Sequence, residues 1–160
     1  MNEYLLDARE ELKRLEHIIY VSLKYTRTVD VIINALNRMV GTFDIIIEAF
    51  LEKAKEENKI TALPKSPALR ATMLGELYPE DQELQRYLTF YAFLKTVLKL
   101  PYSKREEFRR HVTLIVELDH STAEITIDNL TSCEKFMHSF FQYGWRNITG
   151  KTEEDSCFNS

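Results

Sequence analysis

The sequence predicts a mainly α-helical fold. We expect a long antiparallel helix pair with two or three further helices in a bundle, and a small β-hairpin near residues 112–127. Apolar residues recur at steps of three and four over long stretches, which is the period of an amphipathic helix. Only four glycines and four prolines occur in 160 residues, so long uninterrupted helices are expected. Residues 112–127 differ, because they are rich in β-branched and alternating side chains.

The first predicted helix spans residues 3–24, and the second spans residues 29–57. Their apolar stripes comprise Leu5, Ala8, Leu12, Leu15, Ile19 and Ser22, and then Val29, Ile32, Leu36, Met39, Phe43, Ile46 and Phe50, a heptad seam. The stripes are out of phase where they meet. A reversal at residues 25–28, with Thr28 as N-cap, explains the slip and predicts an antiparallel pair. The alternative is a single helix of about 55 residues, roughly 80 Å long. Gly41 costs the second helix about 1 kcal/mol in propensity, and its missing side chain would permit a close helix approach.

A connector and a third long helix follow. Helix-breaking residues punctuate the connector at residues 58–79, namely Pro64, Pro67, Gly75 and Pro79. Within it, residues 66–77 fit a short helix with Ser66 as N-cap and Pro67 at the first helical position. Residues 80–100 form the third helix. This helix is apolar on two faces, so it lies either at the centre of the fold or at a subunit interface.

Another short helix and the hairpin come next. In residues 103–110, Ser103 and Glu106 fit the capping box that starts a helix. Residues 112–118 and 123–128 then form the hairpin, although a continued helix is the alternative for this stretch.

A last helix at about residues 129–145 completes one helical domain, 1–148, and leaves a polar, flexible tail at 149–160. No apolar run approaches the roughly 18 residues of a transmembrane helix, and no signal peptide is visible. We therefore expect no membrane partner. Cys133 and Cys157 are too few for a disulfide framework, which fits a cytoplasmic location.

The positive charge of this acidic chain is concentrated at residues 104–111. The cations there are Lys104, Arg105, Arg109 and Arg110, and Glu106 and Glu107 offset two of their charges. The segment thus carries +2 and the remainder −6, because the whole chain carries −4. Arginines match phosphate oxygens, and His111 can exchange a proton near neutral pH. The segment therefore suits a phosphate-containing ligand, RNA or a nucleotide. The alternative is a solvated helix end that offsets the helix dipole.

Five residues separate Arg105 from His111, and this spacing resembles the motif of the HEPN superfamily. The expected layout, a helical domain built on a long antiparallel pair, resembles that family too. The resemblance implies a metal-independent ribonuclease that works as a homodimer and is often a toxin in a toxin–antitoxin pair. It assigns catalysis to these two residues. The histidine would help the ribose 2′-hydroxyl attack, and the arginine would neutralise phosphoryl oxygens. The further phosphate contacts would be Lys104, Arg109 and Arg110.

A second basic and aromatic segment ends the first predicted helix, with Tyr20, Lys24, Tyr25 and Arg27. Tyrosines can stack on bases while cations contact phosphates, and Arg27 joins the phosphate contacts if this turn lies near His111. Ordinary helix capping is the alternative reading. No metal site or other cofactor is expected, because Cys133 and His138 alone cannot fill a four-ligand shell. The second functional hypothesis is a non-catalytic helical module that dimerises or binds a partner protein.

Overall fold

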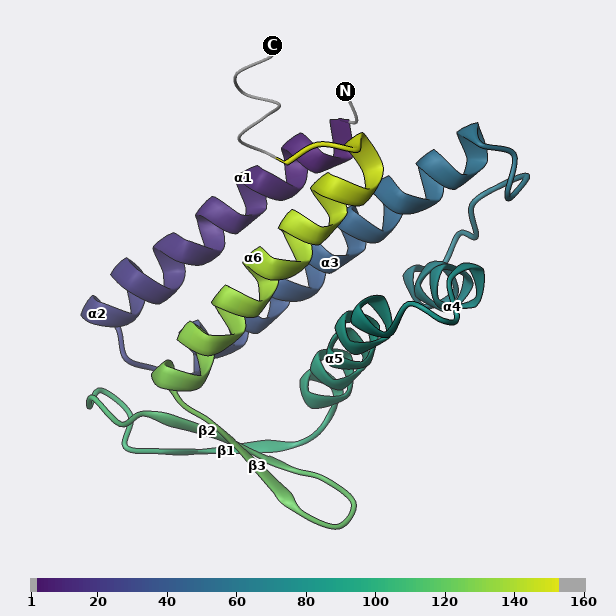
Figure 1. Cartoon of the computed structure of the whole chain (residues 1–160). Coiled ribbons are helices and arrows are strands. Elements are labelled where there is room, and N and C mark those ends of the chain that lie inside the picture. Colours follow the sequence, from purple (N-terminus) through teal and green to yellow (C-terminus); the bar gives the residue numbers. More distant parts are fainter. Residues whose placement is uncertain (1–2, 153–160) are drawn as a thin grey trace.

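The computed structural model describes residues 3–152 and shows a helical bundle with a small sheet at one end (Figure 1). The helical elements are α1 (Glu3–His17), η1 (Ile18–Ser22), α2 (Leu23–Tyr25), α3 (Val29–Glu56), α4 (Pro67–Leu77), α5 (Gln82–Lys99) and α6 (Ile127–Thr149). The strands are β1 (Tyr102–Arg105), β2 (Thr113–Glu117) and β3 (Thr122–Ile125). The predicted class, mainly α with a small β element, is confirmed.

The long antiparallel pair is formed by α1, η1 and α2 in one continuous rod against α3 (Figure 1). The chain reverses at residues 26–28, so the alternative of a single long helix is wrong. Thr28 is the N-cap of α3, and its side-chain oxygen accepts a hydrogen bond from the Val31 N–H at 3.4 Å. Every residue of the predicted second stripe is buried, which confirms the face that α3 presents to the core.

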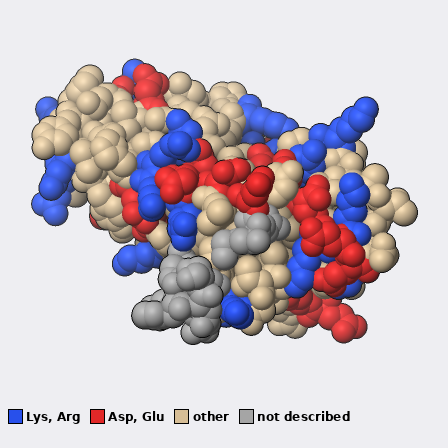
Figure 2. Space-filling view, turned by 90° about the horizontal axis from the view of Figure 1, so that it is seen from above, with Lys and Arg blue, Asp and Glu red and all other residues tan. Residues whose placement is uncertain are grey.

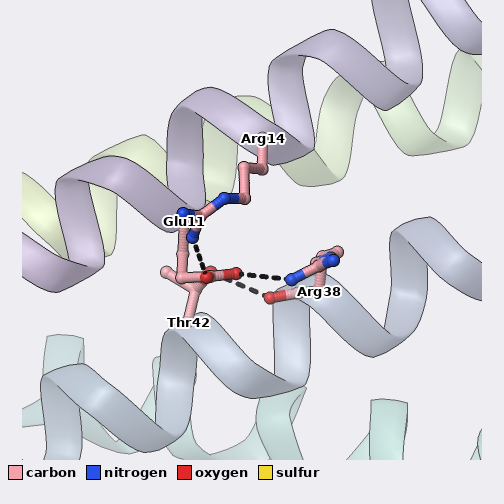
Figure 3. A network of polar contacts seen from close by, with 4 residues as sticks. All are labelled: Glu11, Arg14, Arg38 and Thr42. Carbon is pink, nitrogen blue, oxygen red and sulfur yellow. Dashed lines mark hydrogen bonds and ion pairs between the residues drawn. The ribbon is translucent and has the colours of Figure 1, made fainter.

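A polar network also joins α1 to α3 at the surface (Figure 3). Glu11 accepts hydrogen bonds from Arg14 on its own helix and, at 3.3 Å, from Arg38 of α3. The Thr42 hydroxyl donates to the Arg38 carbonyl oxygen at 2.8 Å. Because both arginines are about half exposed, these ion pairs contribute little to stability. They do tie the two helices together at one point along their length.

Of the two alternatives for the helix predicted at residues 80–100, the central position is wrong, because α3 is the central helix; a subunit interface stays a prediction. α3 contacts α1 and α6 as well as α4 and α5. α5 buries Leu84, Tyr91 and Leu94, but Phe93 on its outer side is 41% exposed. The close helix approach also lies elsewhere than expected. A Cβ added at Gly144 of α6 would lie 3.2 Å from Ile46 Cγ2, whereas one added at Gly41 would meet nothing within 4 Å.

The sheet is antiparallel with the order β1-β2-β3. The predicted hairpin is confirmed as β2 and β3, and the continued helix is wrong. The short helix predicted at residues 103–110 is also wrong, because β1 pairs with β2 and places Arg105 opposite Thr113. Phe108 is the one apolar residue of that segment, so a helix there would have no apolar stripe to bury. Residues 102–105 instead form backbone hydrogen bonds with β2.

The final helix, α6, is longer than predicted at both ends. Thr126 and Asn129 form a capping box that starts it, and Gly150 ends it with φ at 76°. The expected tail at 149–160 therefore overlaps the helix by one residue, and its part at 153–160 lies outside the described residues. The aromatic side chains of α6 belong mainly to the core, as expected. None of the helices at residues 3–152 combines the length and apolar character that crossing a membrane requires.

Candidate functional site

The basic segment forms the end of an edge strand and the turn that follows it. All four residues of β1 are exposed, and Lys104 and Arg105 are its last two. Glu106 and Phe108 then take left-handed backbone conformations, with φ at 56° and 65°. Such conformations are uncommon for residues other than glycine, and they cost stability. The alternative reading as a solvated helix end is wrong, since no helix forms here.

This turn is anchored on the reversal between α2 and α3. The Phe108 N–H donates a hydrogen bond to the Arg27 carbonyl oxygen at 2.7 Å. One carboxylate oxygen of Glu107 accepts from the Val29 N–H at 3.1 Å, at the first residue of α3. Its other oxygen lies 2.9 Å from the Lys104 ammonium. The structure thus brings together the two basic segments that the sequence singles out, which lie about eighty positions apart in the chain.

The Lys104–Glu107 pair has an electrostatic consequence. The hydrogen bond from Lys104, and to a smaller extent that from the Val29 N–H, lowers the pKa of Glu107 below its ordinary value. The same contact raises the pKa of Lys104. Lys104 therefore stays charged, but its charge is largely balanced by Glu107. As a predicted phosphate contact, Lys104 is less available than the arginines that follow it.

Four cations and two aromatic rings gather where the two segments meet. We call this surface the basic–aromatic end; it comprises Lys24, Tyr25, Arg27, Phe108, Arg109 and Arg110. Tyr25 is 84% exposed and Phe108 is 76% exposed. Within residues 3–152, none of its four cationic side chains forms an ion pair. In Figure 2, Lys and Arg side chains project at the left edge, the end that carries α2 in Figure 1, and many Asp and Glu side chains lie toward the middle and right.

Arg105 and His111 flank this turn, and among residues 3–152 no hydrogen bond or ion pair joins their side chains. The Arg105 guanidinium forms an ion pair at 2.6 Å with Glu124 of β3, across the sheet. His111 is exposed, and its carbonyl oxygen accepts a hydrogen bond from the Thr113 hydroxyl. In the part of the chain that the structure describes, no hydrogen bond or ion pair engages the His111 imidazole. His111 is therefore open to a ligand, whereas Arg105 is held by Glu124.

A second polar cluster joins α1 to α6. His138 Nε2 lies 2.6 Å from Glu16 Oε1 and 2.8 Å from Glu134 Oε1. The Tyr20 hydroxyl donates to the other oxygen of Glu134 at 3.0 Å. Glu134 is 5% exposed, so this contact lies at the edge of the core. Burial, followed by the hydrogen bond with Glu134, raises the pKa of Tyr20. Tyr20 is thus committed to this cluster and does not belong to the basic–aromatic end.

No motif in the sequence predicts this cluster as a whole, although two local signals point toward it. Glu16 and Tyr20 lie four residues apart, as do Glu134 and His138, so each pair shares one helix face. His138 is partly buried and hydrogen-bonded. Glu16 lies on α1 and contacts His138 of α6. A one-turn π-helix, η1, follows Glu16, and π-helical turns are often found at functional sites.

Comparisons of the chain with protein-family models, with curated proteins and with solved structures find no match.

Proposed function

We propose that the chain binds single-stranded RNA through the basic–aromatic end. The observation that carries this proposal is the hydrogen bond from the Phe108 N–H to the Arg27 carbonyl oxygen, which joins two exposed basic segments into one surface. Proteins that bind single strands combine cations along the backbone with aromatic rings on which bases stack. Tyr25 and Phe108 supply exposed rings, and Arg109 and Arg110 supply uncommitted guanidinium groups. A duplex would not offer its bases to these rings, so a single strand is the better fit.

The salt dependence of binding tests the electrostatic half of this proposal. Each phosphate contact to a single strand contributes about −0.7 to the slope of log K against log salt, so four cations predict a slope of roughly −3. Arg109→Gln/Arg110→Gln should bring the slope to roughly −1.5. Fluorescence anisotropy of a labelled single-stranded RNA, titrated between about 50 and 200 mM salt, measures this.

A matched control is Lys55→Gln/Lys65→Gln, which removes two exposed cations near the far end of α3. We expect its slope to equal that of the unmodified protein. Equal slopes for the two double variants would show that net charge alone attracts the RNA, and would refute the proposed surface. Binding to anionic lipid vesicles without binding to RNA would refute it as well.

The stacking half of the proposal rests on Tyr25. Tyr25→Ala should weaken RNA binding by about 1–3 kcal/mol, the usual contribution of one stacked base. Tyr25→Leu is the control, because it keeps an apolar side chain and removes the aromatic face. If Tyr25→Leu binds RNA as tightly as the unmodified protein, stacking plays no part in recognition.

Cleavage of the bound RNA is the further step that the HEPN resemblance implies. Its support is the exposed His111 imidazole beside the uncommitted Arg109 and Arg110. Catalysis by Arg105 would require release from Glu124, and an exposed ion pair of this kind costs at most about 1 kcal/mol to break. We expect RNA cleavage in the presence of a chelator, loss of cleavage in His111→Ala, and faster cleavage in Glu124→Gln. Cleavage retained in His111→Ala would exclude His111 from the mechanism.

The second candidate function is assembly into a homodimer through α4 and α5. A groove of 820 Å³ runs between these helices, and Leu69 and Phe93 are 59% and 41% exposed on them. Static light scattering tests this function directly. A dimer should become a monomer in Phe93→Glu, while Tyr25→Glu, which places the same charge at the basic–aromatic end, should leave it intact. A monomeric unmodified protein at high concentration would refute this function.

A further inference from the structure

We propose that Glu16, Glu134 and His138 bind a divalent transition-metal ion between α1 and α6, with Zn²⁺ as the best chemical match. One ligand atom from each residue lies within 4.8 Å of the other two. The set contains one imidazole nitrogen and two carboxylate oxygens. Mixed nitrogen and oxygen ligands suit Zn²⁺ and its neighbours in the first transition row, whereas Ca²⁺ and Mg²⁺ favour oxygen ligands alone.

The single hydrogen that His138 Nε2 can carry cannot fully satisfy both carboxylates of the cluster. His138 Nε2 is close to both carboxylates, at 2.6 Å and 2.8 Å, yet this nitrogen carries at most one hydrogen. A metal ion would accept a lone pair from all three atoms at once. Within residues 3–152, no Lys or Arg side chain forms an ion pair with Glu16 or Glu134. Two carboxylates beside one imidazole therefore leave a negative charge that a dication would neutralise.

The ligands are also held in place by their own helices. Glu134 and His138 lie one turn apart on α6, and Glu16 lies on α1, which packs against α6. The Tyr20 hydroxyl donates to Glu134 Oε2 at 3.0 Å and leaves Oε1 facing His138. Ligating carboxylates commonly receive such an outer hydrogen bond, which orients them toward the metal. Tyr20 is therefore a positioning residue for the site.

An ion can reach this cluster from solvent. The His138 side chain is 40% exposed, while that of Glu134 is 7% exposed. His138 also lines a surface depression of 440 Å³, together with Glu83, Arg86 and Arg146. Three protein ligands would leave a fourth position for water, as in open zinc sites. Because Arg86 and Arg146 line the same depression, a small anion suits this fourth position better than water does.

Isothermal titration of Zn²⁺ into the full chain, after treatment with a chelator and dialysis, tests the site. We expect one ion per chain, with affinity lowered at least tenfold in His138→Gln and in Glu16→Gln. Tyr20→Phe should lower the affinity by about 10-fold or more, which is the usual effect of losing an outer hydrogen bond. Co²⁺, used as a coloured probe, should show visible absorption that His138→Gln abolishes.

The matched control is His17→Gln, which removes an exposed histidine next to Glu16 and should leave the Zn²⁺ affinity unchanged. Circular dichroism checks that each variant is folded. If His138→Gln does not fold, Glu16→Gln carries the test, because that side chain is 41% exposed. The proposal is overturned if the unmodified protein takes up no Zn²⁺, if His17→Gln lowers the affinity as much as His138→Gln, or if a folded Glu16→Gln binds as tightly as the unmodified protein.

Discussion

The two glycines inside long helices offer a direct test of how α3 and α6 pack. Gly41 lies in α3 and Gly144 lies in α6, and each can be changed to alanine. The change in helix propensity is the same at both positions, a gain of about 1 kcal/mol. The surroundings differ, because a Cβ at Gly41 meets nothing within 4 Å, whereas one at Gly144 lies 3.2 Å from Ile46 Cγ2 and 3.5 Å from Phe50 Cε2.

These distances set the expected magnitudes. Gly41→Ala should stabilise the protein by about 1 kcal/mol, which raises the melting temperature by roughly 2–4 °C for a domain of this size. In Gly144→Ala the same gain is opposed by overpacking, which costs about 1–3 kcal/mol. Ile46 is fully buried, so it can shift only by displacing other core side chains. We therefore expect Gly144→Ala to be less stable than Gly41→Ala by about 1–3 kcal/mol.

Urea unfolding measures both variants. Trp145 is the single tryptophan and is 1% exposed, so its fluorescence reports on the core, and circular dichroism reports on the helices. Agreement between the two probes supports a two-state analysis. Equal stabilisation in the two variants would show that α3 and α6 are not in close contact at Gly144. A loss of stability in Gly41→Ala would show that the surface of α3 at this point is covered.

Three further predictions concern pH and capping. Burial raises the pKa of Asp44 above its ordinary 3.8. The contribution of Asp44 to the free energy of unfolding therefore falls as the pH rises through the raised value, and Asp44→Asn should remove that fall. The hydrogen bond from Lys104 lowers the pKa of Glu107 below its ordinary 4.5. The contribution of Glu107 to the free energy of unfolding is therefore present above pH 4.5 and is lost as the pH falls, and Glu107→Gln should remove that loss. Urea midpoints across the acid range measure both effects, and unchanged pH profiles would contradict them. Thr126→Ala should cost about 1 kcal/mol at neutral pH by removing the N-cap of α6, and an unchanged midpoint there would contradict the capping.

The helices could be predicted wherever one face carries a continuous apolar stripe. The stripe of α3 is buried from Val29 to Phe50, because the core selects the period that the sequence displays. The central position, one of the two alternatives for the helix at residues 80–100, is wrong for a related reason. Apolar side chains such as Phe93 show that a face can be buried, but which helix covers it depends on the whole chain.

The error at residues 103–110 has a different cause. Ser103 and Glu106 form a local pattern that resembles a helix start, and local patterns compete with long-range strand pairing. Ser103 instead lies opposite Ile115, a partner twelve positions away. Glu106, with its positive φ, follows β1 directly and begins the turn. No short window of sequence contains both partners of this pairing.

In the candidate site, too, composition predicts some features and tertiary contacts determine the others. Composition was sufficient to locate the basic residues. It could not reveal that Lys104 and Arg105 are balanced by Glu107 and Glu124, because those contacts depend on the turn and on the third strand. The cluster around His138 was missed because Glu16 is more than a hundred residues away and reaches it only through the packing of α1 on α6.

Phe108 lowers the stability of the fold, but it supports the proposed binding of RNA. Its backbone is left-handed, with φ at 65°, and its side chain is 76% exposed. The conformation costs a residue other than glycine roughly 1–2 kcal/mol, and so exposed a ring recovers little of it by burial.

Phe108→Gly should therefore raise stability by about 0.5–1 kcal/mol, since glycine gives back part of the gain as chain entropy. It should also weaken single-stranded RNA binding by about 1–3 kcal/mol through the loss of a stacking surface. Glu106→Gly is the matched control, because Glu106 is left-handed in the same turn, and it should gain similar stability while RNA binding stays as tight or tightens. Urea unfolding and fluorescence anisotropy measure the two quantities. Opposite signs in Phe108→Gly would identify a residue retained for binding, whereas unchanged RNA affinity would remove Phe108 from the interface and leave its strain without a functional reason.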